Sequence, residues 1–160
     1  MADKRKNDSA FLQKYKYEFD KLFIDYLEEI NANIIQYEVI ANETPVAILN
    51  EIRAIMSHMA RLFITDDELI IEENINKIKG HSTRAKLDGY KYLCMAISQR
   101  RMAFFNQYNG IEFSRINNGE FISDINEANE KAEKLLITAK KYECENGPDE
   151  KLYDMYAEAY

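Results

Sequence analysis

The stretch TDDELIIEENINKIKGHSTRAKLDGYKYLCMAISQRRMAFFNQYNG, residues 65–110, decides the fold of this 160-residue chain. Its apolar side chains recur every three or four residues, which is the spacing of a helix with one apolar face. The run TDDE at 65–68 has the form of a capping box, and NG at 109–110 is a typical helix stop. We therefore predict one long helix that ends near Tyr108, with a break near Gly80 as the alternative. The apolar positions include Leu69, Ile71, Ile75, Ile78, Ala85, Leu93, Ala96, Ile97, Phe104 and Phe105.

The remaining segments also have helical spacing. One helix should begin at residue 8 or 9, both good N-caps, and run to about residue 31 or on through Tyr37. Thr44 as N-cap and Pro45 in the first turn predict a second helix that ends near Phe63. Residues 110–122 form a loop with a turn at 117–119, and a helix follows from Ser123 or Asp124 to a stop at 146–148. Its apolar face consists of Ile125, Ala128, Ala132, Leu135, Leu136, Ala139 and Tyr142.

Composition agrees with an all-α fold. The chain is 46% hydrophobic and 31% charged, which disfavours disorder, and it has only 5 glycines and 2 prolines, which disfavours the many turns of an all-β fold. We predict a single domain over residues 1–160, an antiparallel bundle of four to five helices around the long central one. Residues 1–8 should be a frayed end. The last helix, 149–160 with Asp149 as cap, is still running at Tyr160, so it either continues in a longer native chain or docks on a protein partner.

Several classes of function are disfavoured. No apolar run approaches the ~18 residues of a membrane span, and no signal-peptide core follows the polar N-terminus. Cys94 and Cys144 form no CxxC pair, which favours a reduced, cytoplasmic setting. The chain has no Glu-x-x-His pair for a di-iron site, too few His and Cys residues for zinc, and no phosphate-binding glycine loop. We expect neither a metal nor a cofactor.

Charge is unevenly distributed. The net charge is −7, and residues 66–73 hold five acids and no base. Residues 75–101 hold seven basic side chains and a single acid, Asp88. A basic segment in an acidic protein can bind a phosphate-bearing ligand or dock on the acidic surface of the same protein, and the sequence leaves both readings open.

The only two histidines each begin the same pattern. His58 and Arg61 lie on the second predicted helix, and His81 and Arg84 lie on the long one. At about 100° per residue, both pairs fall at the same edge of their apolar faces. Glu51 joins the first edge and Asp88 joins the second. The centre of the second face carries the small residues Ser82, Ala85 and Gly89, which allow a neighbouring helix to approach closely.

An antiparallel hairpin of these two helices would bring the charged edges together. Glu51 would lie level with residues 78–79, within reach of His81 and Arg84. His58 would lie level with residues 71–72, roughly 15 Å from His81 at 1.5 Å of rise per residue. The histidines would then meet only through a dimer or a broken helix. One reading is a structural polar seam in which Glu51 pairs with Arg84 and Asp88 holds His81. The other is an anion or RNA site at a groove edge.

The run RAIMSH, residues 53–58, contains Arg-x4-His and resembles the Arg-x4–6-His signature of HEPN domains. Those are all-α bundles, often dimeric, and many are metal-independent ribonucleases of bacterial toxin and phage-defence systems. The resemblance implies that Arg53 stabilises phosphate charge and that His58 assists attack by a ribose 2′-OH, with two protomers sharing one cleft. On the helical wheel, Arg53 lies opposite the apolar face and points to solvent unless a partner covers it.

Three functional hypotheses follow. The first is a binding module, oligomeric with a dimer favoured, that recognises RNA or another phosphate-bearing ligand in a bacterial or phage conflict system. The second is an active HEPN-type ribonuclease. The third is a structural coupling protein that has no ligand.

Overall fold

The computed structural model describes residues 8–160, of which most are helical and none is in a strand. The prediction of an all-α bundle with one long central helix is confirmed. The predicted frayed end lies almost entirely in residues 1–7, outside the described part. The elements are α1 (Asp8–Lys14), α2 (Lys16–Ile24), the π-helix η1 (Asp25–Ile30), α3 (Asn31–Ala41), α4 (Val46–Leu62), α5 (Glu68–Gln107), the 3-10 helix η2 (Phe113–Gly119), α6 (Glu120–Asn146) and α7 (Glu150–Ala159).

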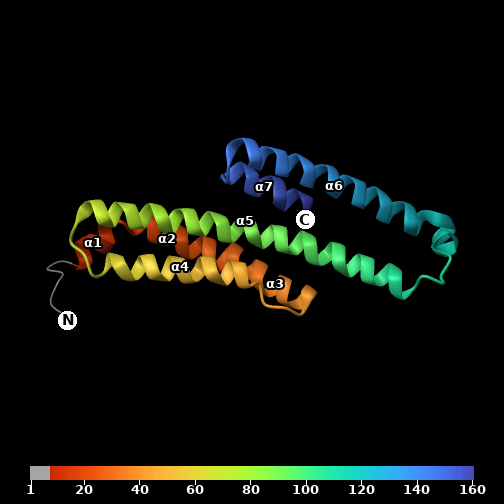
Figure 1. Ribbon diagram of the computed structural model, residues 1–160, viewed down its shortest axis with the longest axis horizontal. Helices are drawn as coiled ribbons and strands as arrows, with labels where there is room; N and C mark the ends of the chain where they lie inside the picture. The colour runs from red at the N-terminus through yellow and green to blue at the C-terminus, as the bar shows by residue number, and fades with distance from the viewer. Residues whose placement is uncertain (1–7) are drawn as a thin grey trace.

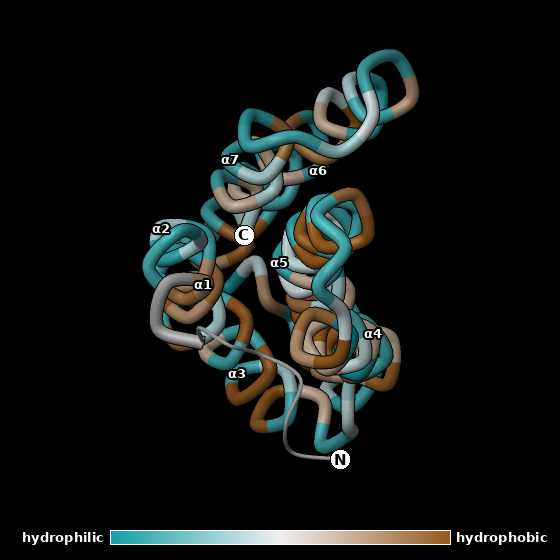
Figure 2. Tube along the Cα trace, turned by 90° about the vertical axis from the view of Figure 1, so that its left-hand side faces the viewer, coloured by the Kyte–Doolittle hydropathy of each residue, from teal (hydrophilic) through white to brown (hydrophobic). Residues whose placement is uncertain are grey.

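The elements form an elongated bundle around α5. The segments α1, α2, η1 and α3 follow one another as an interrupted rod, α4 returns antiparallel to it, and α5 runs beside both and extends beyond them (Figure 1). The hairpin of α6 and α7 lies on the other side of α5. Seen along the bundle, the first rod, α4 and α5 enclose a common interior, and α6 and α7 lie apart from α4 (Figure 2).

The first rod is longer than the minimum predicted. It runs through the predicted extension and ends at Ala41, because Asn42 turns into the left-handed region at φ 55°. The helix continues through the extension because the burial of Ile34 and Tyr37 stabilises these additional turns. The rod's buried apolar side chains are Tyr15, Phe19, Leu22, Ile30, Ile34 and Tyr37.

Two predicted helix starts were wrong by a residue or more. Pro45, not Thr44, occupies the N-cap of α4, and no side chain caps this helix. At α5, the cap is Asp67, whose Oδ1 accepts from the backbone N–H groups of Leu69 and Ile70 at 2.9 and 3.4 Å. Asp67 has extended backbone angles directly before the first helical turn, which is the N-cap geometry. The helix is continuous through Gly80, so the prediction of one long element is confirmed.

The α6 helix begins at Glu120, earlier than predicted, and the preceding loop contains η2. The turn at 117–119 is present, with left-handed φ at Asn117, Asn118 and Gly119. The stop at residue 147 and the Asp149 cap of α7 are confirmed, since Oδ1 of Asp149 accepts from Leu152 N at 2.7 Å. The predicted apolar face is only partly covered: Ala139 alone is fully buried. In Figure 1, α6 runs alongside the distal half of α5 with a gap between the ribbons, and α7 lies between them only near the C-terminal part of α6.

The interior is a row of apolar clusters along α5. Ile30, Ile48, Leu62, Leu93 and Leu152 are fully covered, and each such side chain stabilises the fold by about 1.5–3 kcal/mol. The first rod and α4 supply the clusters toward the start of α5, and α7 and Ala139 supply one near its middle.

At Gly89 of α5 the α3 helix comes close. A Cβ built on Gly89 would lie 2.7 Å from Nδ2 and 2.9 Å from Cβ of Asn33, and both distances are shorter than real contacts. Asn33 is itself buried, and its Nδ2 has no hydrogen-bond partner among the described residues. The predicted role of the small residues on α5, close helix approach, is therefore confirmed at this position.

We expect Gly89→Ala to destabilise the protein by about 1–3 kcal/mol, because the added methyl group overpacks the contact with Asn33. The matched control is Gly80→Ala, where the new Cβ would meet only the flexible Arg84 side chain, at 3.5 Å. That change should be neutral or stabilise the helix by roughly 0.5–1 kcal/mol. Urea denaturation followed by circular dichroism measures both, and equal effects of the two changes would contradict the close approach.

Ion pairs at Glu143 tie α6 and α7 to α5. Its carboxylate accepts from Lys91 Nζ of α5 at 2.6 Å, Lys140 Nζ at 2.9 Å and the Tyr156 hydroxyl of α7 at 3.1 Å. Burial alone would raise the pKa of this carboxyl, but the hydrogen bonds from Lys91 and Lys140 outweigh it and lower the pKa from 4.5 to about 2. Burial and the Glu143 hydrogen bond raise the pKa of Tyr156.

Because the folded pKa of Glu143 is depressed, its contribution is fully present above pH 4.5 and is lost as the pH falls toward 2. We expect Glu143→Gln to lower the free energy of unfolding by about 1 kcal/mol at neutral pH, a value discounted for solvent screening. The difference from wild type should vanish near pH 2. Urea titrations at several pH values test this, with Glu145→Gln, an exposed α6 acid, as the control; a difference independent of pH would contradict it.

Candidate functional site

The charged edges of α4 and α5 meet in a polar seam, which we define as Glu51, His58 and Arg61 of α4 with Asn74, His81 and Arg84 of α5. Glu51 is at its centre. Its Oε2 lies 2.7 Å from His81 Nδ1 and 3.0 Å from Arg84 Nε. The Glu51 and His81 side chains are only 21% and 20% exposed, so both depend on partners within the protein. The predicted pairing of Glu51 with Arg84 is confirmed.

His81 has two competing partners at one nitrogen. Its Nδ1 lies 2.7 Å from Oε2 of Glu51 and 2.7 Å from Nη2 of Arg84. A protonated Nδ1 donates to the carboxylate, and an unprotonated Nδ1 accepts from the guanidinium, so the ring satisfies one contact at a time. In the neutral ring, the first arrangement leaves Nε2 as an acceptor and the second makes Nε2–H a donor. His81 can therefore present either form without moving.

His58 is fixed by an amide. Its Nδ1 lies 2.7 Å from Oδ1 of Asn74, while Asn74 Nδ2 donates to the Ile70 carbonyl at 2.7 Å. Since the second bond identifies the amide nitrogen, the oxygen faces His58 and Nδ1 must donate to it. The neutral ring then carries its lone pair on Nε2. No described residue forms a hydrogen bond with Nε2 of either histidine.

The two imidazoles stack, with ring centroids 5.3 Å apart and planes 25° from parallel. The distance of roughly 15 Å that the sequence predicted between His58 and His81 was wrong for two reasons. First, α4 is shifted along α5, so that Glu51 lies beside residue 81 and His58 beside residue 74. Second, helical side chains lean toward the N-terminus of their own helix, and in an antiparallel pair these two lean toward each other.

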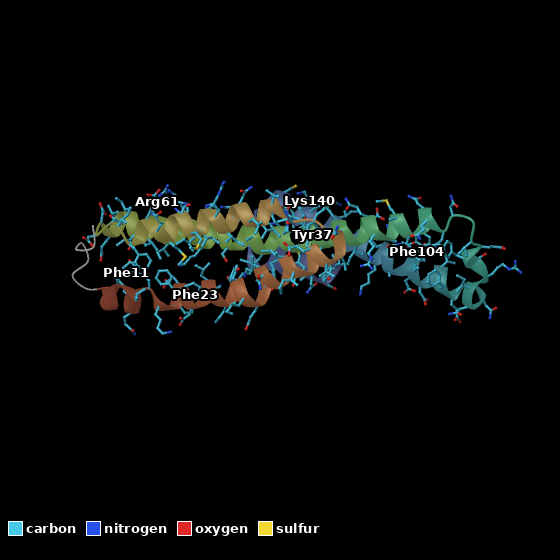
Figure 3. All side chains as sticks on the ribbon, turned by 90° about the horizontal axis from the view of Figure 1, so that it is seen from below. Phe11, Phe23, Tyr37, Arg61, Phe104 and Lys140 are labelled. Carbon is cyan, nitrogen blue, oxygen red and sulfur yellow. The ribbon has the colours of Figure 1, made fainter. Side chains whose placement is uncertain are left out.

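The other predicted site residues lie around this pair. Arg61 is on the outer side of α4, with Nη1 3.5 Å from His58 Nδ1 (Figure 3). Arg53 is exposed, as the helical wheel predicts. Asp88 does not hold His81, whose partner is Glu51, so that prediction was wrong. Burial raises the pKa of the Asp88 carboxyl, and no hydrogen bond to it is found within residues 8–160.

Two features escaped the sequence analysis. Asn74 orients His58, but a lone asparagine in an acidic run gives no signal of that role. A second polar pair, Asp25 with Lys86, lies on another side of α5 at 3.2 Å, and its members are 61 residues apart in sequence. The sequence analysis had noted only one residue at this second pair, the small residue Ser82, whose hydroxyl contacts Asp25.

Within residues 8–160, no three His, Cys, Asp or Glu side chains are placed to hold a metal ion. No helix in that range is both long enough and apolar enough to cross a membrane. Cys94 is half-buried, Cys144 is exposed, and both are free thiols.

Comparison with known proteins gives no match to a family model, to a curated protein or to a solved structure.

Proposed function

We propose that the protein is a binding module for a phosphate-bearing ligand, with single-stranded RNA as the leading candidate, and that the seam is the site. The observation that carries the proposal is the stacked pair His58 and His81. Both rings use Nδ1 within the protein, which leaves both Nε2 atoms for a ligand. When both imidazoles are protonated, their neighbouring Nε2–H groups can donate to the oxygens of one phosphate group. In its neutral form, His58 instead accepts at Nε2, for example from a ribose 2′-OH.

The charges of the seam favour an anion. Arg61 and Arg84 supply two positive charges against the single carboxylate of Glu51, and each imidazole adds another when protonated. Glu73, a neighbouring acid on α5, is paired with Lys77 at 2.6 Å, and this hydrogen bond is the main reason that its pKa is lowered. Most of the basic segment is paired with acids of the protein itself, so the phosphate-ligand reading depends on the surplus at the seam. The pairs are Lys77 with Glu73, Lys79 with Glu18, Arg84 with Glu51, Lys86 with Asp25 and Lys91 with Glu143.

A metal-independent ribonuclease is the second candidate, and the tautomers of the pair favour it. In its neutral form, His58 has an unprotonated Nε2, which can accept a proton from a 2′-OH. His81 presents Nε2–H when Arg84 binds its Nδ1, the form that donates to a leaving group. The HEPN resemblance adds Arg53, which would reach such a site only from a second chain paired along α4, an arrangement different from the distal dimer proposed below. It would also imply a bacterial or phage conflict system, and the two free thiols fit a reducing, cytoplasmic compartment.

The test uses single-stranded RNA with a fluorescent label, in buffer with EDTA. We expect saturable binding by anisotropy, and Arg61→Ala should weaken it about tenfold, the effect of one charged hydrogen bond. Arg115→Ala removes the same charge from an exposed site on η2 and should have little effect. Equal effects of the two changes, or no binding by wild type, would contradict the proposal.

The same samples on a denaturing gel separate binding from catalysis. Cleavage that is lost in His58→Ala with helical content unchanged favours the ribonuclease. Binding without cleavage favours the module. If Glu51→Gln lowers only the free energy of unfolding, and RNA does not bind, then the seam is structural.

We also propose that the protein forms a two-fold dimer through its distal region, residues 95–136. On α5, Ile97 and Phe104 of the predicted core face are 42% and 40% exposed, which is unusual for such side chains, and Met102 between them is 52% exposed. Phe104 is labelled in Figure 3. The distal part of α5 carries Arg100 and Arg101 and no acid, whereas residues 120–134 of α6 carry five acids and two lysines. Two-fold pairing would set the basic tip of each α5 on the acidic α6 of the other copy.

We expect a dimer by size-exclusion chromatography with light scattering, and Phe104→Glu should shift it to monomer with helical content unchanged. Leu69→Glu is the matched control, because Leu69 is 78% exposed at the opposite end of α5. A wild-type protein that stays monomeric at high micromolar concentration would overturn the dimer.

A further inference from the structure

A cavity of about 210 Å³ lies between α2, α5 and the start of α7. Its inner wall is apolar, formed by Phe19, Leu22, Ile75 and Ile78, all of which belong to the core. Its polar end holds Asp25 and Lys86, with Tyr153 of α7 beside them. An apolar pocket with a few convergent polar groups is the usual form of a small-molecule site.

The ion pair at the polar end is nearly buried. The Lys86 and Asp25 side chains are only 12% and 17% exposed, and Lys86 Nζ lies 3.2 Å from Oδ1 of Asp25. Ser82 Oγ lies 3.4 Å from the other carboxylate oxygen. Charged hydrogen bonds are normally about 2.7–2.9 Å long, so both contacts are loose and the carboxylate retains capacity to accept. A buried carboxylate that faces open space is poised for a donor from a ligand.

Asp25 also begins the π-helix η1, where the backbone hydrogen bonds widen by one residue. Such segments are rare and are frequent at functional sites, because the wide turn changes the direction of its side chains. One turn earlier on the rod, Lys21 of α2 lies near enough to interact with the charge of Asp25, but its Nζ pairs with Glu150 at 2.6 Å and forms no ion pair with Asp25. Lys86 is its single cationic partner among the described residues, and the same Nζ lies 5.1 Å from the Tyr153 ring centroid.

The charges around the cavity favour a cation. Its lining has four carboxylates and three ammonium groups. At the mouth, Lys79 pairs with Glu18 at 3.6 Å and Lys21 with Glu150 at 2.6 Å, which occupies two of those ammonium groups. Every lysine of the cavity is therefore neutralised, and the pocket has a surplus of negative charge beside aromatic rings.

We infer that this cavity binds an organic amine: a primary ammonium group on an apolar body about the size of a phenyl ring. The ammonium would bind Asp25 and share it with Lys86, and the body would lie against Leu22, Ile75 and Ile78. A dry cavity of about 150 Å³ accommodates benzene, so the present one has room for a ring and a short chain. None of the seam residues lines this cavity, so the inference is independent of the proposed function.

The test compares three probes of similar shape: 2-phenylethylamine, 2-phenylethanol and 3-phenylpropionate. Binding to the full chain is followed by NMR of the isoleucine methyl groups, where Ile75 and Ile78 report on the cavity. We expect the amine to bind at least about tenfold more tightly than the other two, since it alone forms the charged hydrogen bond. Saturable shifts at Ile75 and Ile78 should accompany it.

Two substitutions with opposite expected signs make the test specific. Asp25→Asn should weaken amine binding about tenfold, whereas Lys86→Gln removes the competing ammonium and should strengthen it. Asp20→Asn removes the same charge from the exposed face of α2, outside the cavity, and should change nothing. If Asp25→Asn lowers the helical content, the result for Lys86→Gln decides the test. Removal of a lysine with a purely structural role would not strengthen amine binding.

Tighter binding of 3-phenylpropionate than of the amine would overturn the inference. So would the absence of saturable shifts at Ile75 and Ile78, or amine binding that Lys86→Gln leaves unchanged or weaker.

Discussion

The alignment of α4 on α5 depends on the Glu51 carboxylate. It is four-fifths covered and has its two partners, His81 and Arg84, on the opposite helix. A slide of α4 by one turn would remove both partners from this mostly buried charge. That loss costs about 1–3 kcal/mol for each unsatisfied group, which is enough to select one alignment. The apolar faces decide that the two helices pair, and the carboxylate decides at which residues they pair.

The stacked histidines follow from that alignment. With Glu51 beside His81, the residue one heptad later on α4 is His58, and it comes level with Asn74. Each ring leans toward the other because the helices are antiparallel. The same α5 helix presents the small residues Ser82, Ala85 and Gly89 to the first rod, which approaches closely at Gly89 and leaves the cavity near Ser82. One helix thus positions the seam and the cavity on different faces, so that a ligand at one need not disturb the other.

Much of the fold could be predicted because its signals are local. The apolar spacing predicted the helices, and Gly147 with the Asp149 cap predicted the last boundary. The length of α5 followed from an apolar spacing that continues through Gly80 with no proline to interrupt it. Boundaries that depend on backbone angles at single residues, such as Pro45 and Asp67, were less accurate. The uncovered distal face of α6 could not be foreseen, because spacing shows that a face is apolar and not what lies against it.

The site was predicted in composition but not in geometry. The residues Glu51, His58, His81 and Arg84 were chosen because they share one edge of their helices, and the structure brings them together. Their distances require the alignment of two helices to within one turn, which no short-range pattern specifies. Asp25 and Lys86 were missed for a related reason: their contact exists only once three elements have assembled.

The alignment of α4 on α5 can be measured through the histidines, since the chain has only these two. The measurement is a nuclear Overhauser effect between their ring protons in the uniformly labelled protein, with a mixed-label sample to exclude transfer between chains. The structure predicts a direct intramolecular cross-peak between His58 and His81. The absence of that cross-peak, in a protein whose circular dichroism is that of a helical bundle, would contradict the alignment and the seam built on it.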